Sequence, residues 1–313
     1  MASYLVTGGA GFIGSHLVDE LVRQGHVVKV VDNLTTGHRR NLKHAGDIEF
    51  IKGDLTDLKV ARSAVRSIDY VLHEAAIPSV QRSVLDPLIS HRSNVDSTLN
   101  ILIAARDAGV KRVVYAGSSS AYGNSPSLPK SEKLSAVPLS PYALQKLVGE
   151  HYARLFMELY ELETVTVRYF NVFGPRQEFL SQYSGVISKF IGAVLEGRQL
   201  IIYGDGEQTR DFTYVRNVVD GTLKACTAPG VTGRIINIAC GGRVSIKKLL
   251  RTLSELTGKT IEPVFQDARS GDIRHSQADI SLARMLLDYR PLTSFREGME
   301  QTLQWYREQR EVD

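Results

Sequence analysis

Cysteine is scarce in this chain of 313 residues, which contains only Cys226 and Cys240. Two cysteines make neither a disulfide framework nor a metal-ligand pattern, so we expect no bound metal. Free thiols fit the reducing conditions of a cytoplasmic protein. No apolar run approaches the length of a membrane span, and the first expected strand begins too close to Met1 to leave room for a signal peptide. We therefore expect no membrane partner.

Charge of one sign is scarce as well. The net charge is +4, and no run of basic residues alternates with aromatic residues. These features give no indication of a nucleic-acid partner. The hydrophobic content of 43% and the charged content of 23% are ordinary for a globular protein. A chain of this length is expected to fold as two lobes.

The most informative local pattern is the glycine-rich segment that ends at Gly14. A short apolar strand, Tyr4–Val6, precedes it, and helical spacing of apolar residues begins at Phe12. Gly8 permits a tight turn, Gly11 lets the backbone approach a pyrophosphate, and Gly14 lets the helix pack against the strand. The helix N-terminus offers free N–H groups to phosphates. The segment therefore predicts a dinucleotide site.

An acidic residue completes this pattern. The second expected strand, Val27–Val31, leads into Asp32, which lies 18 residues after Gly14. A carboxylate at this place binds ribose hydroxyls and repels a 2′-phosphate, which favours NAD over NADP. Arg39 and Arg40 offer a possible phosphate contact, but they are more typical of a solvated loop.

Strands and helices alternate through the first half of the chain. The expected strands are Tyr4–Val6, Val27–Val31, Ile48–Ile51, Tyr70–Leu72, Arg112–Ala116 and Thr164–Tyr169. Helices are expected after the glycine-rich segment and at Leu58–Val65, Pro87–Ala108 and Pro141–Tyr160. Such alternation is typical of an α/β protein with a Rossmann-like, doubly wound parallel sheet. The polar groups that follow the strands are expected at one edge of the sheet.

The second half is less regular, and we expect a smaller α/β C-terminal lobe for the substrate. Residues 1–172 would form the NAD-binding Rossmann domain, with later return strands at about 200–218 and 234–241. Residues 173–313 would form mainly the substrate-binding lobe. Helices are expected at Tyr183–Gly197, Val218–Ala228 and Ser245–Gly258, and strands at Leu200–Tyr203 and Ile235–Ala239.

A tyrosine and a lysine stand four residues apart, at Tyr142 and Lys146, and so share one helix face. An ammonium beside a phenol favours the phenolate, so Tyr142 is a candidate base near neutral pH. Such a pair alone is common on solvated helix faces. Here it follows the nucleotide pattern and the serine run 118–120, and Asn94 lies on the intervening helix, where it could support a proton relay.

These motifs together resemble the extended short-chain dehydrogenase/reductase superfamily. Within it, the chain is most similar to the nucleotide-sugar 4-epimerases, and there to the UDP-N-acetylglucosamine 4-epimerase branch. The motifs that carry the resemblance are Thr7–Gly14, Asp54, His73–Ala76, Asn94, Ser118, Tyr142, Lys146, Arg168–Gln177, Gly204–Gly206, Arg210–Phe212 and Gly271–Ser276.

The resemblance implies roles for individual residues. The catalytic set would be Ser118, Tyr142 and Lys146. The NAD contacts would be Gly8, Gly11, Phe12, Ile13, Gly14, Asp32, Asn33, Asp54, Leu55, Ala75, Asn94, Tyr142, Lys146 and Tyr169. The UDP-sugar contacts would be Ser79, Ser119, Ser120, Asn171, Tyr203, Arg210, Arg269, Asp272 and Ser276. The resemblance also implies a homodimer formed through the helices that begin at Pro87 and Pro141.

Within the substrate set, the resemblance distinguishes several contacts. Asn171, Arg210 and Arg269 would bind the UDP pyrophosphate, although Arg269 without the resemblance is more typical of a surface ion pair. Asp272 would bind the uridine ribose, and Tyr203 would lie near the uracil. Many glucose-type epimerases have a lysine at position 78, where this chain has a proline, so that contact must be absent or replaced.

Ser276 bears on the choice of sugar. Epimerases restricted to UDP-glucose and UDP-galactose tend to carry a tyrosine at this place, whose ring fills the volume that an N-acetyl group needs. The serine predicts interconversion of UDP-GlcNAc and UDP-GalNAc, with UDP-Glc and UDP-Gal also accepted. The alternative is that Ser276 is a solvated loop residue without influence on the sugar.

Other functions stay open. A UDP-glucose 4-epimerase without activity on N-acetylated sugars is one alternative. A sugar 4,6-dehydratase needs acidic residues where this chain has Ser119 and Ser120, and a UDP-glucuronate epimerase or decarboxylase fits the sequence after Pro175 less well. A non-catalytic NAD-binding regulator usually loses part of the Ser/Tyr/Lys set, which is complete here.

Overall fold

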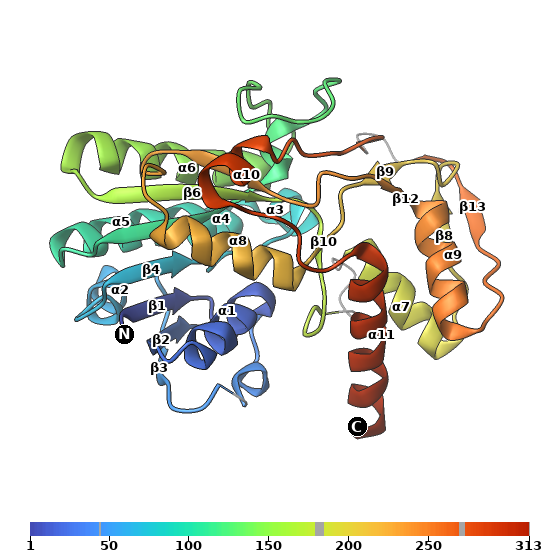
Figure 1. The fold of residues 1–313 in the computed structure, drawn as a ribbon, viewed down its shortest axis with the longest axis horizontal. Helices are drawn as coiled ribbons and strands as arrows, with labels where there is room; N and C mark the ends of the chain where they lie inside the picture. Colours follow the sequence, from blue (N-terminus) through green and yellow to red (C-terminus); the bar gives the residue numbers. More distant parts are fainter. Residues whose placement is uncertain (44, 179–184, 269–272, 313) are drawn as a thin grey trace.

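A seven-stranded parallel sheet organises the molecule (Figure 1). The computed structural model describes residues 1–43, 45–178, 185–268 and 273–312. The strand order is β11-β6-β5-β4-β1-β2-β3. The strands are β1 (Ser3–Thr7), β2 (Val27–Asp32), β3 (Glu49–Lys52), β4 (Tyr70–His73), β5 (Arg112–Ser118), β6 (Glu163–Tyr169) and β11 (Ile235–Ile238). The expected Rossmann-like sheet is confirmed, and its order reverses between β1 and β4, where such sheets bind ligands.

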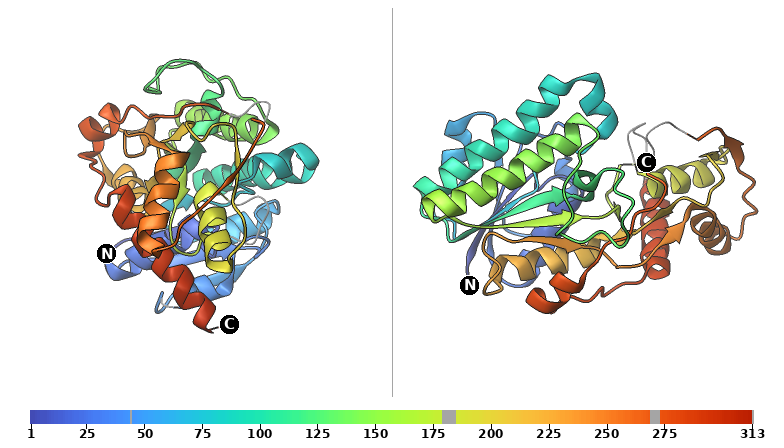
Figure 2. Two further views of the ribbon diagram at one scale, coloured as in Figure 1. Left: turned by 90° about the vertical axis from the view of Figure 1, so that its right-hand side faces the viewer. Right: turned by 90° about the horizontal axis from the view of Figure 1, so that it is seen from above.

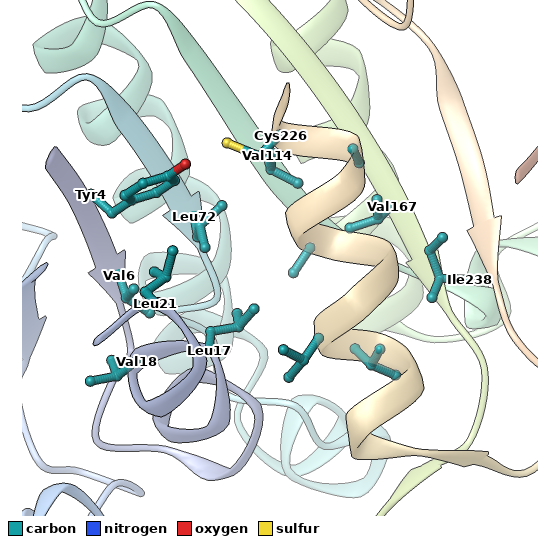
Figure 3. Packing of buried hydrophobic residues seen from close by; sticks show 14 of the residues in the cluster. Tyr4, Val6, Leu17, Val18, Leu21, Leu72, Val114, Val167, Cys226 and Ile238 are labelled. Atoms are coloured by element: carbon teal, nitrogen blue, oxygen red, sulfur yellow. The ribbon is translucent and has the colours of Figure 1, made fainter. Parts of the chain in front are cut away.

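Helices cover both faces of this sheet (Figures 1 and 2). One face carries α1 (Phe12–Arg23), α8 (Val215–Thr227) and α10 (Ser281–Leu287), and the other carries α2 (Leu58–Ala64), α5 (Ser97–Asp107) and α6 (Pro141–Tyr160). Alternate residues of each strand enter the two cores, so Val114 packs beneath α1 and α8 while Val113 packs beneath α2 and α5. Figure 3 shows the first core, with Leu17, Leu21 and Cys226 against the sheet.

The expected long helix from Pro87 is three segments in continuous succession. These are α4 (Pro87–His91), a π-helical segment η2 (Arg92–Asp96) and α5. A short helix not expected from the sequence, α3 (Val80–Leu85), precedes them. Asp86 separates α3 from α4, because its carboxylate accepts from the N–H of Ile89 and Pro87 occupies the first helical turn. The short 3₁₀ helices η1 (Arg39–Leu42) and η3 (Ser119–Tyr122) lie in loops after β2 and β5.

The second half builds a separate core from helices and two-stranded sheets. Its helices are α7 (Val186–Glu196), α9 (Ile246–Thr257) and α11 (Phe295–Val312). Its strand pairs are β8 (Ile201–Tyr203) with β13 (Val264–Gln266), β9 (Thr209–Arg210) with β12 (Val244–Ser245), and β10 (Thr213–Tyr214) with β7 (Val172–Phe173). The expected helix 245–258 is confirmed as α9, which Ser245 caps at its start and Gly258 ends in a left-handed conformation.

One expectation about the sheet is wrong. The strand expected near 234–241 does join it as β11, beside β6. The segment 200–218, however, gives no strand to the seven-stranded sheet, since β8, β9 and β10 all pair elsewhere. Leu200 and Ile202 pack instead into the core of α7 and α9, and α8 is the element that returns to the sheet.

The two-lobe division at residue 172 stays a prediction, and the start of the expected helix at Tyr183 lies outside the described residues. Within the described part of the chain, no helix is both long and apolar enough to cross a membrane.

Candidate active site

A cleft of about 770 Å³ opens at the carboxyl ends of the central strands. This is the edge at which doubly wound sheets bind their ligands. The structure brings most of the expected site residues together here. Those that line the cleft are Gly8, Gly11, Phe12, Ile13, Gly14, Asp32, Asn33, Asp54, Leu55, Ala75, Ser79, Ser118, Ser119, Ser120, Tyr142, Lys146, Tyr169, Asn171, Arg210 and Ser276.

The glycine-rich turn has the shape that a dinucleotide requires. Gly8 has a φ of +64°, and a Cβ there would lie 2.8 Å from the Cα of Ala75. A Cβ at Gly14 would collide with the carbonyl oxygen of Gly8. Helix α1 begins after Gly11, which has no side chain to cap the first N–H groups. These N–H groups lie at the end of the helix that borders the cleft, where they can bind a pyrophosphate. The residues present therefore fit NAD.

The carboxylate of Asp32 stands at the end of β2. Its Oδ2 accepts from the N–H of Ala10 at 3.0 Å, and its Oδ1 accepts from the N–H of Leu34 at 2.7 Å. Burial raises the pKa of Asp32, and the two N–H donors oppose that rise. Arg39 stacks over the ring of Phe50, 3.8 Å from its centroid, rather than lining the cleft. The preference for NAD over NADP that we expect from Asp32 therefore depends on a carboxylate held in a fixed position.

The start of α6 positions the candidate pair Tyr142 and Lys146. Ser140 caps this helix by accepting from the N–H of Ala143, and Pro141 occupies the first turn. Tyr142 and Lys146 then lie on consecutive turns facing β5, where the Nζ of Lys146 donates to the carbonyl of Ala116 at 2.9 Å. The two side chains share the cleft, as their spacing predicts.

The serine run supplies a directed hydrogen-bond chain. The Oγ of Ser118 accepts from the hydroxyl of Ser120 at 2.8 Å and from its N–H at 3.2 Å. A hydroxyl has two acceptor sites and one proton, so the proton of Ser118 is left for Tyr142. Burial raises the pKa of Tyr142, and its hydrogen bond with Ser118 lowers it. The arrangement gives the hydroxyl of Tyr142 a hydrogen-bond donor inside the cleft.

Lys146 differs in part from expectation. Its side chain is buried, and burial lowers the pKa of its ammonium to about 8, against the opposing charges of Glu74 and Glu150. The sequence led us to expect that Lys146 lowers the pKa of Tyr142. In the structure the hydrogen bond that does so comes from Ser118.

Two expected residues lie outside the cleft lining of the described structure, Asn94 and Tyr203. Asn94 is buried, its Oδ1 accepts from the N–H of Ile77 at 2.7 Å, and its Nδ2 donates to Gln145 at 2.9 Å. It thus supports the loop after β4 and helix α6 from behind. Tyr203 ends β8. Arg269 and Asp272 lie outside the described residues.

Two residues near the cleft were not selected from the sequence. Asp211 is buried and accepts from the N–H groups of Cys240, Gly241 and Ala278, which joins the strand of Arg210 to the segment of Ser276. Burial raises the pKa of Asp211 to about 6. Glu74 follows β4 and lines the cleft itself. Its position after a strand was the available signal.

A parallel sheet with a glycine-rich turn and a Ser/Tyr/Lys set defines a dinucleotide-dependent enzyme of the short-chain dehydrogenase type. Residues 4–239 match the family described as "NAD dependent epimerase/dehydratase family", and the chain belongs to it. The expected family, its enzymatic nature and its use of NAD are thereby confirmed.

Similar proteins extend over almost the whole chain. A UDP-glucose 4-epimerase of Mycolicibacterium smegmatis is 38% identical over 97% of this chain and 98% of that protein. A UDP-glucuronate 4-epimerase of Thermodesulfobacterium geofontis is 35% identical over 100% of this chain and 98% of its own length. The solved structure of a UDP-N-acetylglucosamine 4-epimerase from Methanobrevibacter ruminantium M1, in complex with UDP-N-acetylmuramic acid, is 39% identical with a TM-score of 0.94, covering 98% of this chain and 99% of the other.

Proposed function

We propose that this enzyme is a UDP-hexose 4-epimerase that interconverts UDP-GlcNAc and UDP-GalNAc, and also UDP-Glc and UDP-Gal. The observation that carries the proposal is the placement of Ser118, Tyr142, Lys146 and Ser276 around one cleft. The similarity to UDP-sugar 4-epimerases along the whole chain supports the reaction type.

In this proposal Tyr142 takes the proton of the C4 hydroxyl. Ser118 donates a hydrogen bond to the phenolate, and its own oxygen is fixed by Ser120. Lys146 adds a positive charge near the phenolate from its place on the carbonyl of Ala116. Bound NAD supplies a reversible hydride acceptor for C4, so the reaction needs no net oxidant. The 4-keto sugar then rotates so that its opposite face is presented, and Tyr142 returns the proton to the C4 oxygen.

Turning of the sugar requires a firm hold on UDP and a loose hold on the hexose. Arg210 and Asn171 line the substrate side of the cleft and are proposed to bind the pyrophosphate, to which a guanidinium is well matched. We also propose that Arg269 binds the pyrophosphate and that Asp272 binds the uridine ribose. Tyr203 is proposed to lie near the uracil. Serines at positions 119 and 120 offer no carboxyl group for a dehydratase.

Proton NMR tests the proposed substrates directly. UDP-GlcNAc, UDP-Glc and UDP-glucuronate are incubated separately with the enzyme, without added cofactor. We expect the axial C4 products from the first two, because a serine at position 276 fills less of the cleft than a tyrosine would. Conversion of UDP-glucuronate alone, or loss of CO₂ from it, would contradict the proposal, as would turnover of UDP-Glc without UDP-GlcNAc.

We also propose a homodimer, built on the outer face of α3, α4 and α6. Figure 2 shows the helical run from α4 to α5 lying beside α6. Large apolar side chains are exposed there: Val84, Leu85, Leu88, Ile89, Leu144 and Leu159. An uncovered apolar face of this kind is costly in water. Covering it with a second copy removes that cost.

The dimer prediction concerns Leu88 and Leu144, which are 59% and 51% exposed. The double substitution Leu88→Glu with Leu144→Glu places like charges opposite one another in a two-fold interface. Light scattering after size exclusion is expected to show twice the 34.7 kDa chain mass for the parent and the single-chain mass for the variant. Met285→Glu, at an exposed apolar residue on α10, serves as the matched control and is expected to remain dimeric. A monomeric parent refutes the prediction.

A further inference from the structure

The residue of interest is Glu74, directly after β4. The parallel register pairs His73 with Tyr115, which places Glu74 beside Ala116 on the next strand. Ala116 is the residue whose carbonyl receives the ammonium of Lys146. His73 points elsewhere, because its two ring nitrogens contact the hydroxyls of Thr7 and Thr98. Glu74 is half-buried and lines the cleft.

The carboxylate of Glu74 ends a buried chain of hydroxyl groups. The hydroxyl of Tyr169 donates to its Oε1 at 2.7 Å and also contacts the Oγ1 of Thr222 at 2.8 Å. The hydroxyl of Thr222 lies 2.7 Å from the carbonyl of Val218, to which it can donate. Tyr169 and Thr222 have one proton each. When Glu74 is ionised, the hydroxyl of Thr222 donates to Tyr169 and the hydroxyl of Tyr169 donates to Glu74. When Glu74 is neutral, it donates to Tyr169, which donates to Thr222, which donates to the carbonyl of Val218.

Both charge states of Glu74 are therefore hydrogen-bonded. Glu74 therefore keeps its hydrogen bond to Tyr169 in either charge state, which lowers the cost of its partial burial. Burial raises the pKa of Glu74 to about 7, while the hydrogen bond from Tyr169 and the charge of Lys146 oppose the rise.

Three titratable groups face Glu74 from the elements packed around it. Tyr169 comes from β6, and Tyr142 and Lys146 come from α6. The other acid near Lys146 is Glu150, but both of its oxygens accept from the guanidinium of Arg168, at 2.6 and 2.9 Å. Because Arg168 already balances Glu150, Glu74 is the acid left to balance Lys146.

We propose that Glu74 is a positioning residue of the catalytic centre, which holds the hydroxyl of Tyr169 and acts as the counter-ion of Lys146. It takes no proton from the substrate. Its charge acts on Tyr142 and Lys146 together and so shifts the pH range in which the catalytic centre is active. The inference rests on the proposed epimerase function and assigns this residue to that site.

The sign of the effect follows from the charges. An ionised Glu74 raises the pKa of Tyr142 and also raises that of Lys146. Glu74→Gln removes the charge and keeps the shape, so both limbs of the pH profile of kcat/KM are expected to move to lower pH, by roughly 1 unit. Glu74→Asp retains the charge, and its profile is expected to stay near that of the parent although the bond to Tyr169 is lost.

Thr222→Val is the matched control. It removes the other partner of the Tyr169 hydroxyl without changing any charge. If Glu74 acted only through the placement of Tyr169, Thr222→Val would shift the profile as Glu74→Gln does. We expect it to alter rate constants by a few-fold at most and to leave the pH limbs in place.

A second measurement does not depend on turnover. In protein labelled with ¹³C at the glutamate carboxyl carbons, one resonance is expected to titrate between roughly pH 6 and 8, and Glu74→Asp should remove it. Absence of such a resonance, or identical pH profiles for the parent and Glu74→Gln, overturns the inference. A protein that converts no UDP-sugar refutes the proposed function instead, and the carboxyl titration still tests Glu74.

Discussion

Tyr142→Phe is expected to lower kcat by ~10²–10⁴-fold, which is the usual cost of removing a general base. The substitution deletes one hydroxyl and leaves the ring, so α6 and its Ser140 cap should be undisturbed. The hydroxyl of Ser118 loses its acceptor but keeps its bonds from Ser120. The measurement is epimerisation of UDP-GlcNAc under saturating substrate, with bound NAD quantified after denaturation.

Tyr289→Phe is the matched control for this change. Tyr289 is a buried tyrosine whose hydroxyl donates to the carbonyl of Ala239 at 2.9 Å, and it lies outside the cleft lining. Losing that bond costs about 1 kcal/mol of stability and should leave kcat within a few-fold of the parent. If Tyr142→Phe behaves in the same way as Tyr289→Phe, Tyr142 is not the base.

The first half of the fold could be predicted from the sequence because its signals are local. Strands of four to seven residues alternate with helices, and the helix Pro141–Tyr160 carries its start signals, serine and proline, in adjacent positions. The segment 200–218 was misplaced because a short apolar strand carries no information about its partner. Leu200 and Ile202 are buried against α7 and α9, and an apolar pattern does not distinguish this environment from the interior of the sheet.

Much of the candidate site could be predicted for a related reason. Groups that follow parallel strands meet at one edge, so Asp32, Ser118 and Asn171 reach one cleft although they are far apart in sequence. What the sequence does not reveal is orientation. Asn94 turns its amide to Ile77 and Gln145, away from the cleft, within a π-helical segment that no pattern indicated.

Glu74 is a second example of a side chain whose contacts the sequence does not reveal. Its neighbour Ala75 was selected because the resemblance assigns it a contact, whereas Glu74 gains importance only from partners on other elements. Tyr169 and Thr222 come from β6 and α8, and their hydroxyls meet Glu74 only in the folded chain. Its position after a strand indicates a place at the edge of the sheet but does not reveal these partners.

Ser276→Tyr is expected to lower kcat/KM for UDP-GlcNAc and UDP-GalNAc by ~100-fold or more, and to spare UDP-Glc and UDP-Gal. Ser276 is 8% exposed and lines the same cleft as Tyr142, which argues against a solvated loop serine. Its N–H donates to the carbonyl of Thr209, and Asp211 fixes Ala278 two residues later. A tyrosine on this fixed backbone would fill the space proposed for the acetamide, and overpacking of about 3 kcal/mol corresponds to that loss.

Ser276→Ala separates volume from hydrogen bonding in the same experiment. It removes the hydroxyl but keeps the space, so the N-acetylated pair should still be converted with at most a few-fold change. The plain hexoses report whether the tyrosine variant is intact, because a smaller C2 substituent does not reach the added ring. If Ser276→Tyr converts UDP-GlcNAc at the parent's rate, another residue limits the pocket. If it loses both sugar pairs equally, the ring has disturbed the cleft as a whole, and Ser276 does not select the C2 substituent.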